Sequence, residues 1–218
     1  SKEKSMAFEK GHKKFGGRPK GGKNKVKLDI ILVQEPYNPF GRIKSLKNEL
    51  VIHRGAFKTK VRSCILVRKS LNAWKLTQFS DSDQVVVCIK TSMQTLSLCS
   101  IYMPHDSDMD IILDKLDKIV NFCKTKNYRL YISADANSHH VAWGSSDTNG
   151  RGNKLFEYFL DNNMTVNNRG NVSTFVTRNR QEVLDITVSD NRAATYVKDW
   201  RVRQEESYSD HKNNIFLY

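Results

Sequence analysis

The chain has 218 residues, a hydrophobic content of 39% and a formal net charge of +13. That length suits one substantial domain and is marginal for two. No apolar run approaches the length of a membrane span, and the N-terminus lacks the apolar stretch of a signal peptide, so we expect an intracellular protein, nuclear or cytoplasmic, without a membrane partner. The positive charge favours a polyanionic partner, most simply nucleic acid, although charge alone suits a solubilising tail equally well.

The charge is concentrated at the N-terminus. Residues 1–27 hold ten Lys or Arg residues and two Glu residues, a local surplus of eight positive charges. The segment GHKKFGGRPKGGKNK is rich in Gly and Lys and offers almost nothing to bury. We therefore predict a disordered basic arm over residues 1–26, without strand or helix, followed by one folded domain over residues 27–218.

The folded part begins with strands. LDIILVQEP, residues 28–36, is a continuous apolar run that ends at a proline, which is typical of a strand buried on both faces. RSCILVRKS (62–70) predicts a second strand, and residues 83–90 and 95–104 predict an antiparallel hairpin across TSMQ. The four cysteines lie in apolar runs without a C-x-x-C pair, which indicates buried free thiols in a reducing compartment rather than a zinc site.

Helices and short strands alternate in the second half. Apolar residues at helical spacing predict a helix from about Asp108 to Lys126, capped by Ser107 or Asp108. A buried strand (128–134) and a second helix (about 152–162) follow. Short strands are expected near TVNN, STFVT, VLDITVS, DWRVRQ and NIFLY. This mixture predicts an α+β arrangement of two packed sheets with helices outside, and no Gly-rich motif supports a Rossmann or P-loop fold.

Polar residues stand at the ends of the predicted strands, where they could meet at one edge of a sheet. Each has an ordinary alternative: a solvated strand end, turn residues, a core tyrosine or an exposed histidine. A carboxylate inside the apolar segment VLDITV must be paired if it is buried, and this is the sharper signal. The residues are Glu35, Tyr102, Asp135, Asn137, Asp185, Asp210 and His211.

The tripeptide Ser209, Asp210 and His211 is not expected to act as a hydrolytic serine triad. Consecutive side chains point in different directions, whereas such a triad converges from separate elements. The whole set suits phosphodiester hydrolysis instead. Hard oxygen ligands such as Glu35 and Asp210 suit Mg²⁺, an Asp can orient or deprotonate water, and a His paired with an Asp can stabilise a charged transition state.

The motifs also occur in a familiar order. The series QEP, SIYMP, DANSHH with WGS, NGRGNKL, STF, LDITVS, DW and SDH resembles the endonuclease domain of non-LTR retrotransposons, within the exonuclease–endonuclease–phosphatase superfamily that includes apurinic endonucleases. The resemblance covers about residues 28–218. It implies an α/β fold, a four-layer α/β sandwich of two packed mixed sheets with outer helices, and a site at one end of the two sheets.

The resemblance also implies roles for individual residues. Glu35 and Asp210 would bind the metal, Tyr102 and His211 would contact the scissile phosphate, and Asp185 would orient His211. Asp135 would activate water, with Asn137 as its companion. His139 is implied to contact DNA or to play a structural role, and Arg151 is implied to contact DNA or only to hold a loop. The implied cofactor is Mg²⁺, with Mn²⁺ as an alternative ion, and the implied partner is double-stranded DNA.

One departure from the family concerns the N-terminus. The family normally opens with a strand that carries an Asn motif, followed by a helix, and here the basic arm stands in their place. We therefore expect the first strand to be missing, which would expose a sheet edge.

Three functions follow from these motifs. The first is a Mg²⁺-dependent endonuclease that nicks target DNA for retrotransposon insertion by target-primed reverse transcription. The second is a catalytically impaired remnant that only binds DNA, and the third is an apurinic repair endonuclease or phosphatase of the same fold. We expect a monomer, and the reverse transcriptase region that normally lies C-terminal in the family is absent from this chain.

Overall fold

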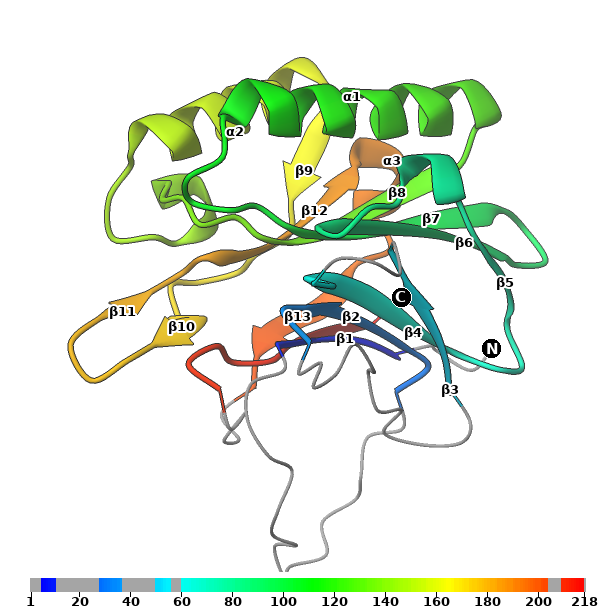
Figure 1. Ribbon diagram of the computed structural model, residues 1–218, viewed down its shortest axis with the longest axis horizontal. Helices are drawn as coiled ribbons and strands as arrows, with labels where there is room; N and C mark the ends of the chain where they lie inside the picture. The colour runs from blue at the N-terminus through cyan, green and yellow to red at the C-terminus, as the bar shows by residue number, and fades with distance from the viewer. Residues whose placement is uncertain (1–4, 11–27, 37–49, 56–59, 204–208, 218) are drawn as a thin grey trace, which may run out of the picture.

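The computed structural model describes residues 5–10, 28–36, 50–55, 60–203 and 209–217. Two six-stranded sheets pack face to face, and helices cover the outer face of one of them (Figure 1). Sheet A has the order β13-β14-β1-β2-β4-β3 and sheet B the order β5-β6-β7-β8-β12-β9. Both sheets are mixed, because β1 pairs with β2 and β7 with β8 in parallel while their other neighbours are antiparallel. This confirms the predicted mixed α/β sandwich.

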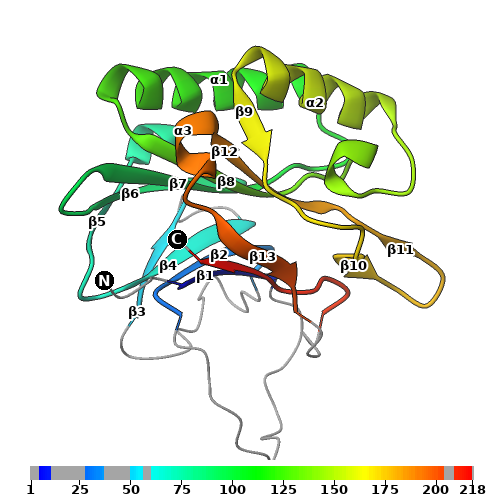
Figure 2. The same ribbon diagram turned by 180° about the vertical axis from the view of Figure 1, so that it is seen from behind.

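The strands of sheet A come from both ends of the chain, and Figure 2 shows this sheet from behind. They are β1 (Ser5–Lys10), β2 (Ile30–Gln34), β3 (Leu50–Arg54), β4 (Ser63–Arg68), β13 (Lys198–Val202) and β14 (Asn214–Leu217). Sheet B contains β5 (Asn72–Lys75), β6 (Gln84–Lys90), β7 (Thr95–Tyr102), β8 (Arg129–Asp135), β9 (Met164–Val166) and β12 (Asp185–Asp190). A separate two-stranded hairpin, β10 (Phe175–Val176) with β11 (Gln181–Glu182), projects from the body (Figure 1).

The predicted absence of the first strand is wrong. Residues 5–10 form β1, which fills sheet A between two other strands: it runs parallel to β2, with Met6 opposite Ile30, and antiparallel to β14, with Ser5 opposite Leu217. Neither β2 nor β14 therefore presents the exposed edge that a missing strand would leave.

The strand could not be recognised because SMAFEK is too short to show a hydrophobic period and is surrounded by lysines. The strand is defined by its pairing with β2 and β14, which are distant in sequence. Such tertiary context overrides local β-propensity. The prediction of an arm without regular structure thus fails for residues 5–10, and residues 11–27 lie outside the described residues. SMAFEK contains no Asn, so the family's first-strand Asn is not on β1.

Side chains alternate between the two faces of each strand, so sheet B contributes to two hydrophobic cores. On β6, Val85, Val87 and Ile89 face sheet A, whereas Val86 and Cys88 face the helices, and all five are at most 1% exposed. A strand buried on both faces needs a continuous apolar run, which is the pattern the sequence showed. The four cysteines are free and buried, as predicted, and burial raises the pKa of the Cys88 thiol to about 11, so it stays protonated and structural.

The helices follow their sequence signals closely. α1 (Met109–Lys126) begins after Asp108, whose side chain accepts a hydrogen bond from the backbone N–H of Asp110 (2.9 Å), and ends at Asn127 in the left-handed conformation. α2 (Gly150–Asp161) starts two residues before the predicted boundary because Asn149 caps it. α3 (Asn191–Ala194) is short. No helix in the described part of the chain is long and apolar enough to cross a membrane.

Candidate functional site

Three strands of sheet B bring polar side chains to one edge. Tyr102 is the last residue of β7 and Asp135 the last of β8, and the two are register partners in the parallel ladder. Asp185 is the first residue of β12 and lies opposite Asp135 in the antiparallel ladder. Asp135 is 0% exposed and Asp185 7% exposed, and buried carboxylates require hydrogen-bonding or charged partners.

His211 is the partner of Asp185. Its ring nitrogen Nδ1 lies 2.7 Å from Asp185 Oδ2, and both side chains are buried. The ring also packs edge-on against Phe175 of the projecting hairpin, at 4.8 Å between centroids. Since Nδ1 faces the carboxylate, the other ring nitrogen, Nε2, points away from Asp185. The sequence-predicted pair is therefore present in the structure.

The neighbouring residues Ser209 and Asp210 form a turn. The hydroxyl of Ser209 accepts a hydrogen bond from the backbone N–H of His211 (3.2 Å), and the carbonyl of Asp210 accepts one from the N–H of Val176 (2.7 Å). The Asp210 side chain is exposed. These contacts place His211 beside β10, and the Ser209 hydroxyl takes part in a local turn.

Asp135, Asp185 and His211 form a group that could hold a metal ion, with one ligand atom from each lying within 4.8 Å of the others. Carboxylate oxygens are the ligands that Mg²⁺ prefers. A metal on Nδ1 of His211 would replace its hydrogen bond to Asp185, whereas a metal on Nε2 would leave that bond in place. Neither of the two predicted metal ligands, Glu35 and Asp210, belongs to such a three-residue group among the described residues.

Glu35 directly follows β2 in sheet A and is half-buried. It has a positive φ of 46°, an uncommon conformation for a residue other than glycine. Its backbone N–H donates to the carbonyl of Arg62 (2.7 Å), which holds this turn against the start of β4. Strained backbone of this kind often lies at functional sites.

Asn137 connects the ends of β8 and β7. It also has a positive φ, 43°, and its amide Nδ2 donates to the carbonyl of Met103 (3.1 Å), while its N–H donates to Asp135 Oδ1 (3.4 Å). Asn137 is thus a turn residue, and it is also in contact with the carboxylate that we expected it to accompany.

A buried network of hydrogen bonds connects the two sheets next to these strand ends. Gln34 Nε2 donates to Ser100 Oγ (2.9 Å) and to the carbonyl of Ser133 (3.1 Å), and Ser63 Oγ donates to the carbonyl of Ser100 (2.7 Å). Gln34 and Ser63 belong to sheet A, whereas Ser100 and Ser133 belong to sheet B. The network therefore fixes Glu35, the next residue after Gln34, relative to the strands that carry Tyr102 and Asp135.

His139 lies in a second cluster, at the base of the projecting hairpin. Its Nδ1 is 2.5 Å from Asp147 Oδ1, and its Nε2 is 2.5 Å from Arg180 Nη2. A guanidinium can only donate hydrogen bonds, so Nε2 of His139 is an acceptor and Nδ1 donates a hydrogen bond to Asp147. His139 thus links the loop after β8 to the hairpin and is not part of the Asp135 group.

Glu182 belongs to the same cluster and was not anticipated from the sequence. It is 5% exposed, and its oxygens accept hydrogen bonds from the Ser146 hydroxyl (2.5 Å), the Ser146 N–H (3.0 Å) and the Val183 N–H (2.9 Å). Burial by itself raises the pKa of Glu182, but these hydrogen bonds and nearby His139 lower it below its ordinary value. The oxygens of Glu182 already accept three hydrogen bonds, and Arg180 lies beside His139. We therefore infer that this cluster has a structural role.

Arg151, in the first turn of α2, holds a loop. Its Nη1 donates to the carbonyl of Ser107 (2.5 Å) and its Nη2 to that of Pro104 (3.0 Å), in the segment that joins β7 to α1. These contacts support the loop-holding alternative, and a DNA contact through Arg151 stays a prediction.

The comparisons with known proteins identify the family and the fold of the chain. A family model described as "Endonuclease-reverse transcriptase" matches residues 96–215, more than half of the chain. The endonuclease domain of TRAS1, a telomere-specific non-LTR retrotransposon, has a TM-score of 0.82 at 22% identity, with 98% of this chain and 97% of that chain covered. A search of curated proteins finds no match.

Two further solved structures share the fold. The AP endonuclease LMAP from Leishmania major has a TM-score of 0.70 at 13% identity, covering 88% of this chain and 78% of that one. The 3′ phosphatase NExo from Neisseria, bound to product DNA hairpin, has a TM-score of 0.67 at 14% identity, with 98% of both chains covered. The fold, the strand-end carboxylates and the family match lead to one conclusion: the chain belongs to the endonuclease–reverse transcriptase family, whose members are the phosphodiester-hydrolysing nucleases that the sequence motifs predicted.

Proposed function

We propose that the protein is a Mg²⁺-dependent DNA endonuclease that nicks one strand of double-stranded target DNA and leaves a 3′-hydroxyl from which reverse transcription is primed. The observation that carries this proposal is the buried Asp185–His211 pair beside Asp135 at the strand ends of sheet B, in a chain of the endonuclease–reverse transcriptase family. A reverse transcriptase region would use the 3′-hydroxyl, and we propose that the endonuclease acts as a monomer.

The proposed metal ligands are Glu35 and Asp210. A metal held by these two carboxylates leaves the Asp185–His211 pair available for the phosphate. When bound, Mg²⁺ would neutralise phosphate charge and assist departure of the leaving oxygen. The chemistry of two carboxylates and several waters suits this ion, and Mn²⁺ would substitute for it.

The other residues act on water and phosphate. Asp135, buried at the end of β8, orients and deprotonates the attacking water, and Asn137 holds its carboxylate through a backbone hydrogen bond. Asp185 accepts a hydrogen bond from Nδ1 of His211, and the protonated ring donates from Nε2 to the phosphate. The hydroxyl of Tyr102 donates a hydrogen bond to the same phosphate. Hydrogen bonds from these groups strengthen as negative charge develops in the transition state.

A repair-type activity is the second candidate. The fold is shared with an AP endonuclease from Leishmania major and a 3′ phosphatase from Neisseria. An abasic-site duplex and a duplex with a 3′-phosphate, each compared with intact DNA of the same sequence, separate these activities from target nicking. The impaired remnant loses its main support, because β1 occupies the position where a strand was expected to be missing.

The test is plasmid nicking. Purified protein is incubated with supercoiled plasmid and Mg²⁺, with and without a chelator, beside the Asp210→Ala and His211→Ala variants. We expect open-circular product only for the wild-type protein with free Mg²⁺. Equal nicking in all samples would rule out a metal nuclease at this site, and no nicking by the wild-type protein would support a remnant that only binds DNA.

A further inference from the structure

Arg62 lies where four strand ends of the two sheets meet, directly before β4. Its backbone carbonyl accepts the N–H of Glu35 (2.7 Å), and its own N–H donates to the carbonyl of Ser82 (2.7 Å). The N–H of Tyr102 donates to the carbonyl of Asp83 (2.8 Å). These bonds connect the ends of β2 and β7 with the starts of β4 and β6. The backbone of Arg62 therefore lies between the proposed metal ligand and the strand that carries Tyr102.

The side chain of Arg62 reaches across the same junction. Its Nε and Nη2 donate to the two oxygens of Asp83, at 2.5 and 2.8 Å, and its Cζ lies 5.1 Å from the centroid of the Tyr102 ring. The side chains of Arg62 and Asp83 are 31% and 18% exposed, so this bidentate pair is better shielded than a surface ion pair. The carboxylate thus fixes the guanidinium against the aromatic ring.

We propose that Arg62 is a positioning residue for Tyr102: its bidentate contact with Asp83 holds the guanidinium against the ring and keeps the phenol hydroxyl directed at the scissile phosphate. This rests on the proposed function, because it assumes that Tyr102 meets a phosphate. A planar guanidinium is needed, since a lysine ammonium carries the charge but cannot bridge both oxygens of Asp83 and stack on the ring. The sequence offered no signal for the contact beyond a basic and an acidic residue that each precede a strand.

A rival role for Arg62 is a direct DNA contact. The third guanidinium nitrogen, Nη1, has no hydrogen-bond partner in the part of the chain that the structure describes, and it could donate to a DNA phosphate. A phosphate contact would change the KM for DNA and the salt dependence of binding. A positioning role would instead change the rate of the chemical step, because a small displacement of a catalytic group costs rate even when the substrate is bound.

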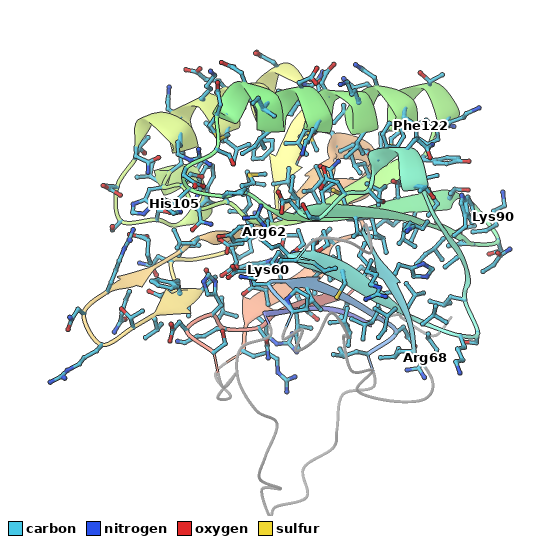
Figure 3. The ribbon with its side chains drawn as sticks, in the orientation of Figure 1. Lys60, Arg62, Arg68, Lys90, His105 and Phe122 are labelled. Carbon is cyan, nitrogen blue, oxygen red and sulfur yellow. The ribbon has the colours of Figure 1, made fainter. Side chains whose placement is uncertain are left out.

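The same strand provides a matched control. Arg68, the last residue of β4, forms an ion pair with Asp29 and donates from Nη2 to the carbonyl of Leu28 (2.9 Å). Arg62 and Arg68 are thus two arginines at opposite ends of one strand, each paired with an aspartate, and Figure 3 labels both. Of these two arginines, Arg62 is the one that contacts Tyr102. A loss of rate that comes only from weakening the strand should therefore follow from substituting either arginine.

The first experiment measures single-turnover nicking and KM for Arg62→Met, Arg62→Lys, Asp83→Asn and Arg68→Met with plasmid DNA and Mg²⁺. We expect Arg62→Met and Asp83→Asn to be slower by about tenfold or more with nearly unchanged KM, Arg62→Lys to be intermediate, and Arg68→Met to match the wild-type rate. Equal rates for Arg62→Met and Arg68→Met would overturn the proposal. A raised KM for Arg62→Met, with a weaker salt dependence of DNA binding and an unchanged nicking rate, would also overturn it.

A second readout does not depend on activity. The protein is labelled with ¹³C at its tyrosine rings, and the Tyr102 signal is assigned from the Tyr102→Phe variant. We expect this signal to shift in Arg62→Met and Asp83→Asn but not in Arg68→Met, and an unmoved signal overturns the positioning role. If the wild-type protein does not nick DNA, the proposed function fails, while the Tyr102 signal still decides whether Arg62 orients the ring. If Arg62→Met does not fold, Asp83→Asn and Arg62→Lys carry the same comparison.

Discussion

His211 and Asp185 form a buried hydrogen bond of 2.7 Å between Nδ1 and Oδ2, although 26 residues separate them in sequence. The first residue of β12 provides the carboxylate, and the turn before β14 provides the histidine. With a carboxylate oxygen as its partner, Nδ1 of His211 carries a proton, and a ring that is also protonated on Nε2 can donate to a phosphate. The orientation of Nε2 therefore depends on Asp185.

The Asp185→Asn variant tests this dependence. An amide in place of the carboxylate removes the negative charge that stabilises the protonated ring, and its NH₂ group can make Nδ1 an acceptor, so that His211 is held in its neutral form. We expect the single-turnover nicking rate to fall by about 10²-fold or more, with little change in the thermal midpoint. Asp190→Asn, at the other end of β12, is a control for the strand itself, and an equal loss of rate in that variant would contradict a specific role for Asp185.

Mg²⁺ titrations separate the proposed metal ligands from the residue that acts on water. We expect Glu35→Gln and Asp210→Asn to need a higher Mg²⁺ concentration for half-maximal nicking, because each removes a charged oxygen ligand. Asp135→Asn should instead lower the rate at saturating Mg²⁺ without a comparable change in the Mg²⁺ requirement. The opposite pattern would mean that the ion is held by the Asp135, Asp185 and His211 group.

Acid should destabilise the fold through Glu182. The pKa of this carboxyl is lower in the folded protein than its ordinary value of 4.5, so the folded state binds fewer protons than the unfolded state. Its contribution to stability is therefore complete above pH 4.5 and is lost as the pH falls through the folded-state pKa. We expect the free energy of unfolding to fall less steeply with acid in Glu182→Gln than in the wild-type protein or in Glu157→Gln, whose glutamate is exposed.

The N-terminal strand should be essential for stability. β1 lies between β2 and β14, so its removal exposes one edge of each of these two strands. We expect a variant that lacks residues 1–10 to unfold at much lower urea concentration than the full chain, or to aggregate, whereas a variant that lacks only residues 1–4 should unfold like the full chain. Identical urea midpoints for the two truncations would contradict the placement of β1.

Arg151 should contribute to stability rather than to DNA affinity. Two of its guanidinium nitrogens donate to backbone carbonyls of the loop between β7 and α1. Arg151→Ala removes these bonds, and we expect a loss of about 1–3 kcal/mol in the free energy of unfolding, with Arg178→Ala of the exposed hairpin as the neutral control. A shallower salt dependence of DNA binding without a stability loss would instead show that Arg151 contacts phosphate.

The sequence predicted the elements whose signal is local. Continuous apolar runs predicted β2, β6, β7 and β8, and Asp108 predicted the start of α1, because burial on both strand faces and helix capping are visible over a few residues. The same strands end in Tyr102 and Asp135, so the meeting of polar side chains at one edge could be expected before the fold was known.

Contacts between distant segments could not be predicted in this way. β1 is a strand because β2 and β14 flank it, and nothing in SMAFEK itself requires one. Arg62 meets Asp83 and Tyr102 because two sheets pack together, and His139 meets Arg180 because a hairpin folds back on a loop. The family resemblance anticipated the Asp185–His211 pair but not these supporting contacts.

The most direct test of the proposed site is a double-mutant cycle for Asp185 and His211, read as the single-turnover rate of plasmid nicking at saturating Mg²⁺. If Asp185 acts by orienting His211, the Asp185→Asn/His211→Ala double variant should be no slower than His211→Ala alone. Once the His211 ring is absent, Asp185 has nothing left to orient. Rate losses that multiply in the double variant would contradict this account. Nicking at the wild-type rate in His211→Ala would contradict the site itself.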